Sequence, residues 1–578
     1  MYTISDSALP SSSGASRSYR YMEIYENIKQ EIINGVLTEN SRLPSIRKLA
    51  EFLAVSATPV ELAYQQLIAE GFVESRPRRG YYVAKLPEPY GKLGGGNIQR
   101  EAEASGHSAG WSHGQAAGLD SEPATGRSTE QNAGPAARQN TGEVNWLGAG
   151  QTARRSARQS AGQTARPSAR QSAGQTSGPS AVQTAGQTAS RSQAQSAEAK
   201  PVPQPAREYT YDFHLSKNDF SLFPFSVWKK LHHQLFRPEN AGLLFYGEAQ
   251  GELGLRTEVA GYLRQFRGVV CAPERIVIAA EQHVLVHHLA LLLQTHTDCM
   301  AFEDPGYRII PATFRAAGYR LEPVALDENG LRPDLLRQSA ARVVSVSPSH
   351  QFPTGMVMPV GRRLELLEWA KMVDGYILED DYGGEFRYQG RPIPSLQGLV
   401  PNDHVIYLGG FSQVLAPDFC IHYMVLPERL AARYHDLRRD IMFEASSSRT
   451  HQRVLEQFIK DGYFERHVRR MRNLYRKKNR QLCASIEQHF GEYAVIRGDS
   501  AGLHVVLQVC SSLPEADLLR LAQEAGIRVA SAAFFWNPPP GTDRKSFMVG
   551  FGGIPMERID EGIALLQKVW SPVLDKLM

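Results

Sequence analysis

The sequence predicts a multidomain protein, in which a small N-terminal α+β unit and a large C-terminal α/β unit are joined by a long linker. The chain has 578 residues, which is more than a single hydrophobic core normally organises. Helical periodicity begins near residue 21, and strand-like apolar runs alternate with helical patterns from about residue 208. The predicted parts are a disordered tail at 1–20, a domain at 21–84, a flexible linker at 85–207 and a domain at 208–578.

Composition and charge exclude several classes of protein. Hydrophobic residues make up 42% of the chain, and the net charge of +4 is too small to identify a nucleic-acid partner. The five cysteines lack CxxC spacing, which argues against a disulfide framework or a zinc ribbon. The first twenty residues contain no signal-peptide core, and no apolar run reaches the roughly 18 residues of a membrane span. We therefore expect a cytoplasmic protein with no membrane partner.

Two helices are predicted at the start of the N-terminal unit. Apolar residues from Tyr25 to Ile33 recur at helical spacing, and Gly35 is a natural stop for this first helix. Pro44 then ends the preceding segment, and Ser45 is placed to cap a second helix.

A third helix and a basic hairpin complete this unit. Ser56 is placed to cap a helix over residues 57–70, and Pro59 lies in its first turn, where a missing N–H is tolerated. Two short strands are predicted at residues 72–75 and 81–83, and the five residues between them read RPRRG. Helix, turn, helix and basic hairpin together form the layout of a winged helix-turn-helix.

This layout predicts contacts with double-stranded operator DNA. The major groove admits the first turn of the third helix, which would bring Thr58 to base edges or phosphates. Arg47 and Lys48 would reach the backbone or a guanine edge, and the wing arginines would contact phosphates or the minor groove. The predicted DNA-binding residues are Ser45, Arg47, Lys48, Ser56, Thr58, Pro59, Arg76, Arg78, Arg79 and Gly80.

A family resemblance covers residues 43–84, which read LPSIRKLAEFLAVSATPVELAYQQLIAEGFVESRPRRGYYVA. This run resembles the GntR family of winged-helix regulators, because it combines the helix spacing, the LPSxRxLA box and a glycine-tipped wing. One position departs from the family: Ala57 follows the capping serine where relatives usually carry arginine. The departure implies that a major-groove or phosphate contact is missing, so that either the affinity or the operator sequence differs.

The middle segment has the composition of a flexible linker. It contains a degenerate repeat, RQSAGQTAR at residues 158–166 and RQSAGQT at residues 170–176, and almost no large apolar side chains between residues 151 and 200. Such a segment cannot bury enough apolar surface to offset the entropy of ordering. As a random coil it would span about 55–65 Å. Its arginines would add at most a weak attraction to DNA, and a solvated tether is the simpler interpretation.

The C-terminal unit reads as an α/β domain. Residues 276–278, 343–346 and 376–378 form β-rich runs, and helical patterns lie over residues 284–293 and 361–371. Four motifs follow in order: EDPGYRIIPATFRAAGY, SVSPSHQFPTG, ILEDDYGGEFRY and YLGGFSQVLAP. Together they resemble the aminotransferase-like domain of the MocR subgroup of GntR regulators. The resemblance implies a class I aminotransferase fold (fold type I), pyridoxal 5′-phosphate binding and a homodimer formed through this domain.

Pyridoxal phosphate needs a lysine amine, an acid at the pyridine nitrogen, a stacking surface and a phosphate cradle. The matched motifs imply that Asp380 is the acid, Tyr382 reaches the phenolic oxygen, Tyr307 stacks on the ring and His350 lies near it. Relatives carry FSK where this chain has FSQ, so Gln413 stands at the lysine position. An amide nitrogen is a poor nucleophile, and no covalent cofactor is expected. The predicted relict or noncovalent site comprises Tyr307, His350, Asp380, Tyr382, Ser412 and Gln413.

The phosphate cradle implied by the resemblance is altered as well. Relatives have a glycine-bearing turn such as GAGTQ at a helix N-terminus, whereas residues 279–283 read AAEQH. Glu281 would place a carboxylate near a dianion, Cys420 replaces an expected arginine and His422 replaces a glycine. These changes point to a domain that is not an enzyme, that has no covalent cofactor and that binds pyridoxal phosphate only noncovalently, if at all.

Other interpretations stay open. One is a pyridoxal-phosphate-dependent transaminase with an appended DNA-binding module, and another is a dimeric DNA-binding protein that needs no ligand. A metal site is not expected: His283 and His287 are four residues apart, but Val284 stands where a metalloprotease box has glutamate. The leading interpretation is a cytoplasmic, nucleoid-associated homodimer that binds operator DNA and senses a small-molecule effector.

Overall fold

The structure is a computed structural model that describes residues 17–76, 79–86, 208–215, 217–388, 394–441, 447–536 and 544–576. The predicted linker at 85–207 therefore lies almost wholly outside the described residues, as does Arg78 of the predicted DNA-binding set. The predicted N-terminal tail differs at its end, because the first helix already begins at Arg17.

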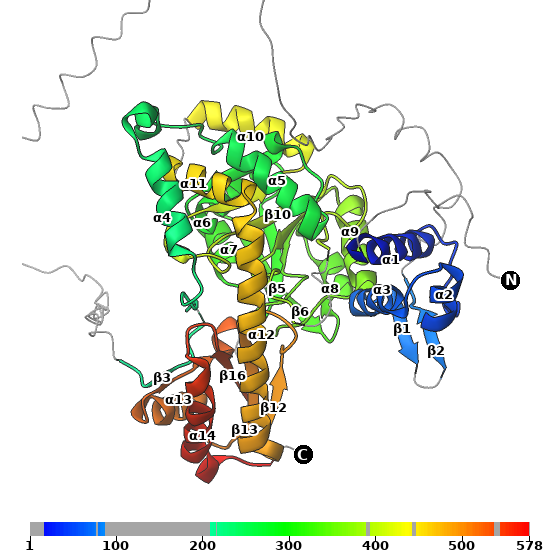
Figure 1. Ribbon diagram of the computed structural model, residues 1–578, viewed down its shortest axis with the longest axis vertical. Coiled ribbons are helices and arrows are strands. Elements are labelled where there is room, and N and C mark those ends of the chain that lie inside the picture. Colours follow the sequence, from blue (N-terminus) through cyan, green and yellow to red (C-terminus); the bar gives the residue numbers. More distant parts are fainter. Residues whose placement is uncertain are drawn as a thin grey trace, which may run out of the picture. The chain divides into compact units, whose positions relative to one another are not determined.

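The N-terminal module contains three helices and a two-stranded hairpin (Figure 1). Its elements are α1 (Arg17–Ile33), α2 (Ile46–Phe52), α3 (Ala57–Glu70), β1 (Val73–Arg76) and β2 (Gly80–Val83). Helix α1 packs against α3, and the Tyr25 hydroxyl donates a 2.8 Å hydrogen bond to the Glu70 carboxylate. The strands pair antiparallel with Arg76 opposite Gly80. The predicted winged helix-turn-helix is confirmed, with each wing strand shifted by about one residue.

The helix boundaries in this module follow from local capping. The Ser45 hydroxyl accepts a hydrogen bond from the Lys48 N–H at 3.3 Å, so Ser45 caps α2 as predicted. Ser56 occupies the N-cap of α3, but its side chain forms no capping hydrogen bond. Gly71 ends α3 with φ of +82°, a left-handed conformation that glycine adopts without steric cost.

The C-terminal domain is built around an eight-stranded sheet in the order β4-β11-β10-β9-β8-β5-β6-β7. Neighbouring strands from β10 to β6 run parallel, while β11 is antiparallel to β10 and β4, and β7 is antiparallel to β6. The strands are β4 (Ile276–Ala279), β5 (Cys299–Asp304), β6 (Arg320–Asp327), β7 (Gly330–Leu331), β8 (Val343–Val346), β9 (Tyr376–Asp380), β10 (Val405–Gly410) and β11 (His422–Val425). The predicted α/β class is confirmed.

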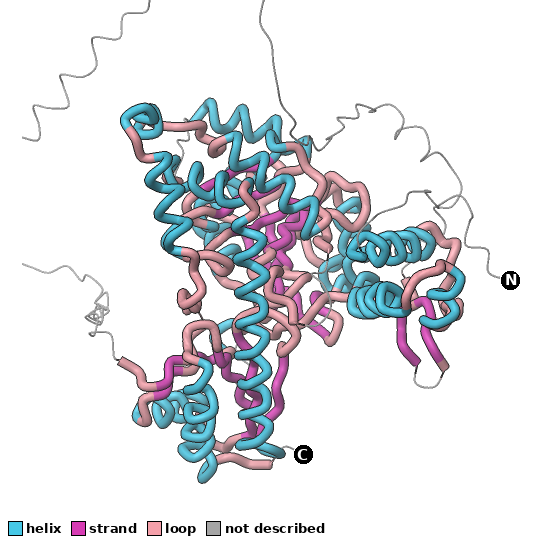
Figure 2. The backbone as a smooth tube through the Cα atoms, viewed as in Figure 1, coloured by secondary structure: helices cyan, strands magenta, loops and turns pink. Residues whose placement is uncertain are grey.

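Helices cover both faces of this sheet (Figure 2). One face packs against α6 (Gln282–Leu293), α7 (Ile309–Ala316) and α10 (Glu428–Ile441). The other face packs against α5 (Leu253–Arg267), α8 (Pro333–Gln338), α9 (Val360–Met372) and α11 (Arg449–Lys460). Because both faces are buried, β4, β8 and β9 are apolar along almost their whole length, apart from the polar end of β9.

A second, smaller sheet completes the domain. It has the order β12-β13-β16-β15, and each neighbouring pair is antiparallel. Its strands are β12 (Ala494–Arg497), β13 (His504–Cys510), β15 (Ala530–Ser531) and β16 (Arg544–Gly550). The accompanying elements are α4 (Phe225–Leu235), the 28-residue helix α12 (Tyr463–Phe490), α13 (Glu515–Glu524), α14 (Ile559–Trp570) and the short parallel pair β3 (Tyr211–Asp212) and β14 (Ile527–Arg528).

Candidate DNA-contacting surface and cleft

The helix-turn-helix presents several of the predicted residues to solvent. Arg47 and Lys48 are exposed on the first turn of α2, and Thr58 is exposed on the first turn of α3. Pro59 is buried. It therefore supports the first turn of α3 from inside the module, and the prediction that it contacts DNA does not fit its position. Ala57, also exposed, offers only a methyl group on the first turn of α3.

The two described arginines of the wing, Arg76 and Arg79, differ in their contacts with the rest of the module. Arg76 is engaged within the module: its guanidinium donates to Asn40 at 2.6 Å and to Glu74 at 3.2 Å, and it lies 4.5 Å from the centre of the Tyr82 ring. Part of its charge is therefore already compensated by Glu74. Arg79 is exposed.

Sequence reasoning missed one basic residue at the wing. The Arg42 guanidinium lies beside Gly80, because a Cβ built on that glycine would be 3.6 Å from Arg42 Nε. Arg42 also forms an isolated β-bridge with Tyr82, far along the chain from its own segment. The neighbouring residues pair with the same strand, since the Leu43 N–H donates to the Tyr81 carbonyl at 2.9 Å and the Val83 N–H donates to the Ser41 carbonyl at 2.9 Å. No sequence pattern indicated this pairing. Gly80 has φ of +102°, so the wing needs glycine there.

The predicted cofactor residues gather in a cleft at the carboxyl ends of the parallel strands. Asp380 is the last residue of β9, while Tyr307 follows β5 and the pair Ser412 and Gln413 follows β10. Ligands of open α/β sheets bind at this edge. The cleft has a volume of about 450 Å³, and these four residues and Tyr382 all line it.

Asp380 is buried, and its environment is unusual for a carboxylate. The Gln282 side-chain amide, at the start of α6, donates a 2.6 Å hydrogen bond to Asp380 Oδ1. The pKa of Asp380 is raised to about 7, chiefly by burial; the Gln282 hydrogen bond opposes this rise and the neighbouring Asp381 charge adds to it. The structure therefore gives Asp380 a protein partner, Gln282, that sequence reasoning had counted only as part of the altered cradle.

Two other predicted residues carry polar atoms without partners. His350 is 2% exposed, and neither of its ring nitrogens has a hydrogen-bond partner in the described structure. Burial lowers the pKa of His350 to about 3, so its ring is neutral. The buried hydroxyl of Tyr382, whose ring lies 5.5 Å from the His350 ring, is also without a partner there. His350 lies behind the wall of the cleft rather than on it.

The loop after β10 is held by its neighbours. The Asn218 side chain donates to the carbonyl oxygens of Ser412 and Gln413, both at 3.0 Å. The Ser412 hydroxyl lies 3.4 Å from His422 Nε2, and His422 Nδ1 lies 3.0 Å from the Ala280 carbonyl. The backbone at Gln413 is thus fixed, and its side chain faces the cleft.

The residues at the altered cradle come together in space. Glu281 is the N-cap of α6, and the Cys420 thiol lies 3.9 Å from its carboxylate. Cys420 itself adopts a left-handed backbone conformation with φ of +51°. A carboxylate therefore stands at the helix N-terminus, where an anion would otherwise be stabilised.

Asp381, which lines the cleft, forms a buried ion pair with Arg267. Arg267 Nε lies 2.6 Å from Asp381 Oδ2, and the two side chains are 2% and 4% exposed. Arg267 also donates to the Ser349 hydroxyl at 2.8 Å, and the Tyr407 hydroxyl donates to Asp381. Arg267 and Asp381 are 114 residues apart, so no local sequence pattern predicts this pair.

These residues do not fit pyridoxal phosphate. Among the described residues, no lysine and no arginine lines the cleft. Glu281 places a carboxylate at the N-terminus of α6, where the family resemblance implies a phosphate group, and the Gln282 amide donates to Oδ1 of Asp380, the acid implied for the pyridine nitrogen. The described part of the chain also contains no group of three or more His, Cys, Asp or Glu residues suited to a metal ion. None of its helices is long and apolar enough to cross a membrane.

Comparisons with known proteins agree with both halves of this architecture. Residues 20–83 match the family described as bacterial regulatory proteins, gntR family. The chain is 30% identical over 561 residues to the HTH-type transcriptional regulator YdeL of Bacillus subtilis, covering 95% of this chain and 96% of that protein. It is 28% identical over 552 residues to the probable rhizopine catabolism regulatory protein MocR of Rhizobium meliloti, covering 95% and 93%.

Among solved structures, an archaeal alanine:glyoxylate aminotransferase matches with a TM-score of 0.58 at 24% identity, covering 64% of this chain and 91% of that one. This likeness shows that the C-terminal domain has the aminotransferase fold. The chain belongs to the MocR-type transcriptional regulators of the GntR family, which join a helix-turn-helix domain to an aminotransferase-like domain.

Proposed function

We propose that this regulator is a homodimer that binds operator DNA through its paired winged helices and responds to a small effector, without covalent cofactor chemistry. The single observation that carries the effector part is the cleft, which keeps the fold's binding place while Gln413 stands at its lysine position. By its DNA-binding role, we place the protein in the cytoplasm, associated with the nucleoid.

The DNA-binding half of the proposal rests on the exposed residues of the module. Arg47, Lys48 and Thr58 are exposed, and so are Arg42 and Arg79 at the wing. Selection of binding sites from random duplexes with the full-length protein tests this directly. We expect enrichment of a motif with two half-sites, as direct repeats or palindromes. Recovery of no enriched motif would contradict sequence-specific binding.

The loss of cofactor chemistry rests on the polarity of the cleft. An amide cannot replace the lysine amine, and the described lining offers no cation for a phosphate group. The absorbance of the purified protein between about 330 and 430 nm, with pyridoxal phosphate added, tests this. We expect no new band and no borohydride-stable adduct at a cleft lysine.

A Gln413→Lys variant makes the same test sharper. If Gln413 were the only defect, this single change would restore a coloured adduct. Because Glu281 and the Gln282–Asp380 hydrogen bond remain, we expect the variant to stay colourless. A coloured, catalytically active wild-type protein would instead establish the second candidate function, a transaminase with an appended DNA-binding module.

The homodimer is supported by an exposed apolar face on the C-terminal domain. It consists of Phe225, Phe236, Leu244, Phe245 and Tyr246, which are 64–81% exposed. Helix α4 and the segment before Leu244 both pack on α11, so the two parts of this face adjoin the same helix. Exposed apolar clusters of this kind mark protein–protein contacts, and the fold resemblance implies that a second copy covers this one.

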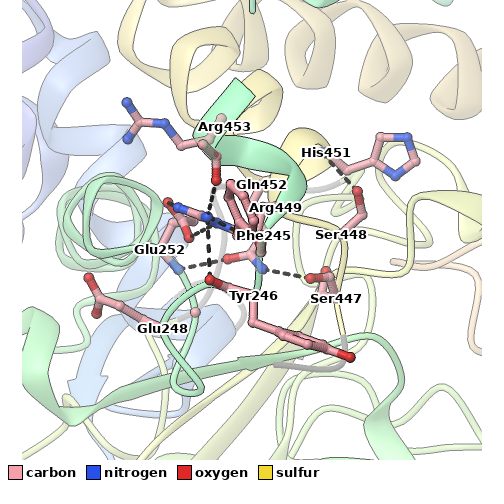
Figure 3. A network of polar contacts seen from close by, with 12 residues as sticks. Phe245, Tyr246, Glu248, Glu252, Ser447, Ser448, Arg449, His451, Gln452 and Arg453 are labelled. Atoms are coloured by element: carbon pink, nitrogen blue, oxygen red, sulfur yellow. Dashed lines mark hydrogen bonds and ion pairs between the residues drawn. The ribbon is translucent and has the colours of Figure 1, made fainter. Parts of the chain in front are cut away.

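The exposed apolar face is held in place by a polar network (Figure 3). Arg449 Nε lies 2.8 Å from Glu252, and Arg449 Nη1 donates to the carbonyl oxygens of Gly242 at 2.7 Å and Phe245 at 3.1 Å. The Gln452 side chain accepts from the Glu252 N–H at 2.8 Å. The backbone of residues 242–246 is therefore fixed, while the Phe245 and Tyr246 side chains are exposed to solvent, as a preformed interface requires.

A further inference from the structure

The charges that line the cleft are of one sign. Its described lining contains three carboxylates, Glu281, Asp380 and Asp381, and neither lysine nor arginine. The charge of Asp381 is compensated by Arg267, whose Nε lies 2.6 Å from Asp381 Oδ2. Glu281 and Asp380 have no salt-bridge partner among the described residues. An anionic ligand would therefore be repelled, and a cationic ligand would find two carboxylates without counter-ions.

One wall of the cleft is aromatic. Phe352 lies at its centre, with ring centroids 5.9 Å from Tyr307 and 5.7 Å from Tyr382, both in edge-to-face geometry. All three line the cleft. The faces of aromatic rings attract cations, and such walls recognise organic ammonium groups better than hydrated inorganic ions.

One polar atom at this wall and one ring behind it have no hydrogen-bond partner among the described residues. They are the buried Tyr382 hydroxyl, which lines the cleft, and the two ring nitrogens of His350, which is 2% exposed and does not line it. The His350 ring lies 5.5 Å from Tyr382 and 5.7 Å from His504, which also lines the cleft. A Tyr hydroxyl can accept a hydrogen bond from an N–H donor, and the unmet capacity of Tyr382, which lines the cleft, points to a ligand that supplies one.

We propose that the cleft binds a small organic cation, an amine or amidine carried on an apolar body, with neither a phosphate nor a carboxylate group. This inference deepens the proposed effector function and rests on it. The ammonium group lies between Glu281 and Asp380, and the apolar body lies against Tyr307, Phe352 and Tyr382. The cleft of about 450 Å³ suits a molecule of this size.

The protonation of Asp380 supports this assignment. Burial raises its pKa to about 7, and the groups that face it are the Gln282 amide, Asp381, Glu303 and the hydroxyls of Tyr307 and Tyr382. None of these groups is a cation. A bound ammonium group would supply the missing positive charge and hold Asp380 ionised.

Isothermal titration calorimetry on the full-length protein tests the proposal with a matched series. Benzylamine, benzyl alcohol and benzyl phosphate share one apolar body and differ in charge, and agmatine represents an aliphatic cation. We expect benzylamine to bind about tenfold to a hundredfold more tightly than benzyl alcohol, as charge-assisted hydrogen bonds imply. We expect no binding of benzyl phosphate.

Two substitutions assign the binding to the cleft. They are Glu281→Gln, at an exposed position, and Asp380→Asn, which keeps the shape of the side chain. Each should weaken the binding of benzylamine by about tenfold and leave the affinity for benzyl alcohol unchanged. Glu328→Gln, at an exposed turn remote from the lining, is the matched control and should have no effect. Because Glu281 is exposed, its substitution leaves the fold intact even if Asp380→Asn destabilises it.

The proposal is overturned if neither cation binds, if benzyl alcohol or benzyl phosphate binds as tightly as benzylamine, or if both cleft variants retain wild-type affinity. Operator affinity, measured with and without benzylamine, separates this proposal from the effector function. If benzylamine binds and operator affinity is unchanged, the cation site stands and effector control fails. If a phosphate ester or carboxylate alters operator affinity instead, effector control stands and the cation site fails.

Discussion

The salt dependence of operator binding offers a quantitative test of the DNA-contacting surface. Four exposed basic residues of each module, Arg42, Arg47, Lys48 and Arg79, are available to phosphates, whereas Arg76 is partly neutralised by Glu74. A dimer would then make about eight phosphate contacts, which predicts a slope of log K against log salt of about −7. Between 50 and 200 mM salt, affinity should fall by about 10⁴-fold.

Arg47→Ala removes one of these contacts from each module. We expect the slope to become shallower by about 1.8, because each lost phosphate contact contributes about 0.9. Fluorescence anisotropy with an operator duplex over a salt series measures both slopes. Arg520→Ala, an exposed arginine paired with Asp517 and Glu524 on α13, is the matched control and should leave the slope unchanged. An Arg47→Ala slope equal to that of the wild type would refute the assignment of Arg47 to DNA.

Three further predictions concern the C-terminal domain. Phe245→Glu should convert the proposed dimer to a monomer in sedimentation velocity, whereas Phe534→Glu, at another exposed phenylalanine, should leave it dimeric. Arg267→Met should lower the free energy of unfolding by about 3–5 kcal/mol in urea titrations, and adding Asp381→Asn should recover most of the loss, because the damage comes from an unpaired buried charge. Asp380→Asn should raise Tm at pH 8 and leave it unchanged near pH 4. The pKa of Asp380 is raised to about 7 in the folded protein, so the wild-type protein loses stability as the pH rises from the pKa of the unfolded chain toward 7, and the variant does not.

Local patterns predicted the secondary structure of both domains well. The expected helix at residues 284–293 is α6 (Gln282–Leu293), and the expected strand at 343–346 is β8 with the same bounds. Ser45 caps α2 because an N-cap needs only its own residue and the N–H three positions later. Such features depend on a few neighbouring residues, which is why sequence alone predicts them.

The chemistry of the candidate sites depended on partners distant in sequence. Arg267 meets Asp381 across 114 residues, and Gln282 meets Asp380 across 98. Arg42 reaches the wing because its segment pairs with the second wing strand, about 40 residues further along the chain. Motifs place Asp380 in a cleft, but its pKa and its occupied oxygen follow from burial and from a side chain that no local pattern connects to it.

The unpaired atoms of the cleft bear on how a signal could arise there. A buried polar atom without a hydrogen bond costs about 1–3 kcal/mol, and among the described residues the Tyr382 hydroxyl at the cleft is such an atom. A ligand that forms a hydrogen bond with this hydroxyl regains that free energy in addition to its own contacts, and it stabilises the domain by mass action. Stabilisation alone changes no operator affinity, because a ligand shifts an equilibrium only by its difference in affinity between two states. Ligand affinity must therefore be compared between operator-bound and free protein: a ratio of one would make the cleft a stabilising site, and any other ratio measures its control over DNA binding directly.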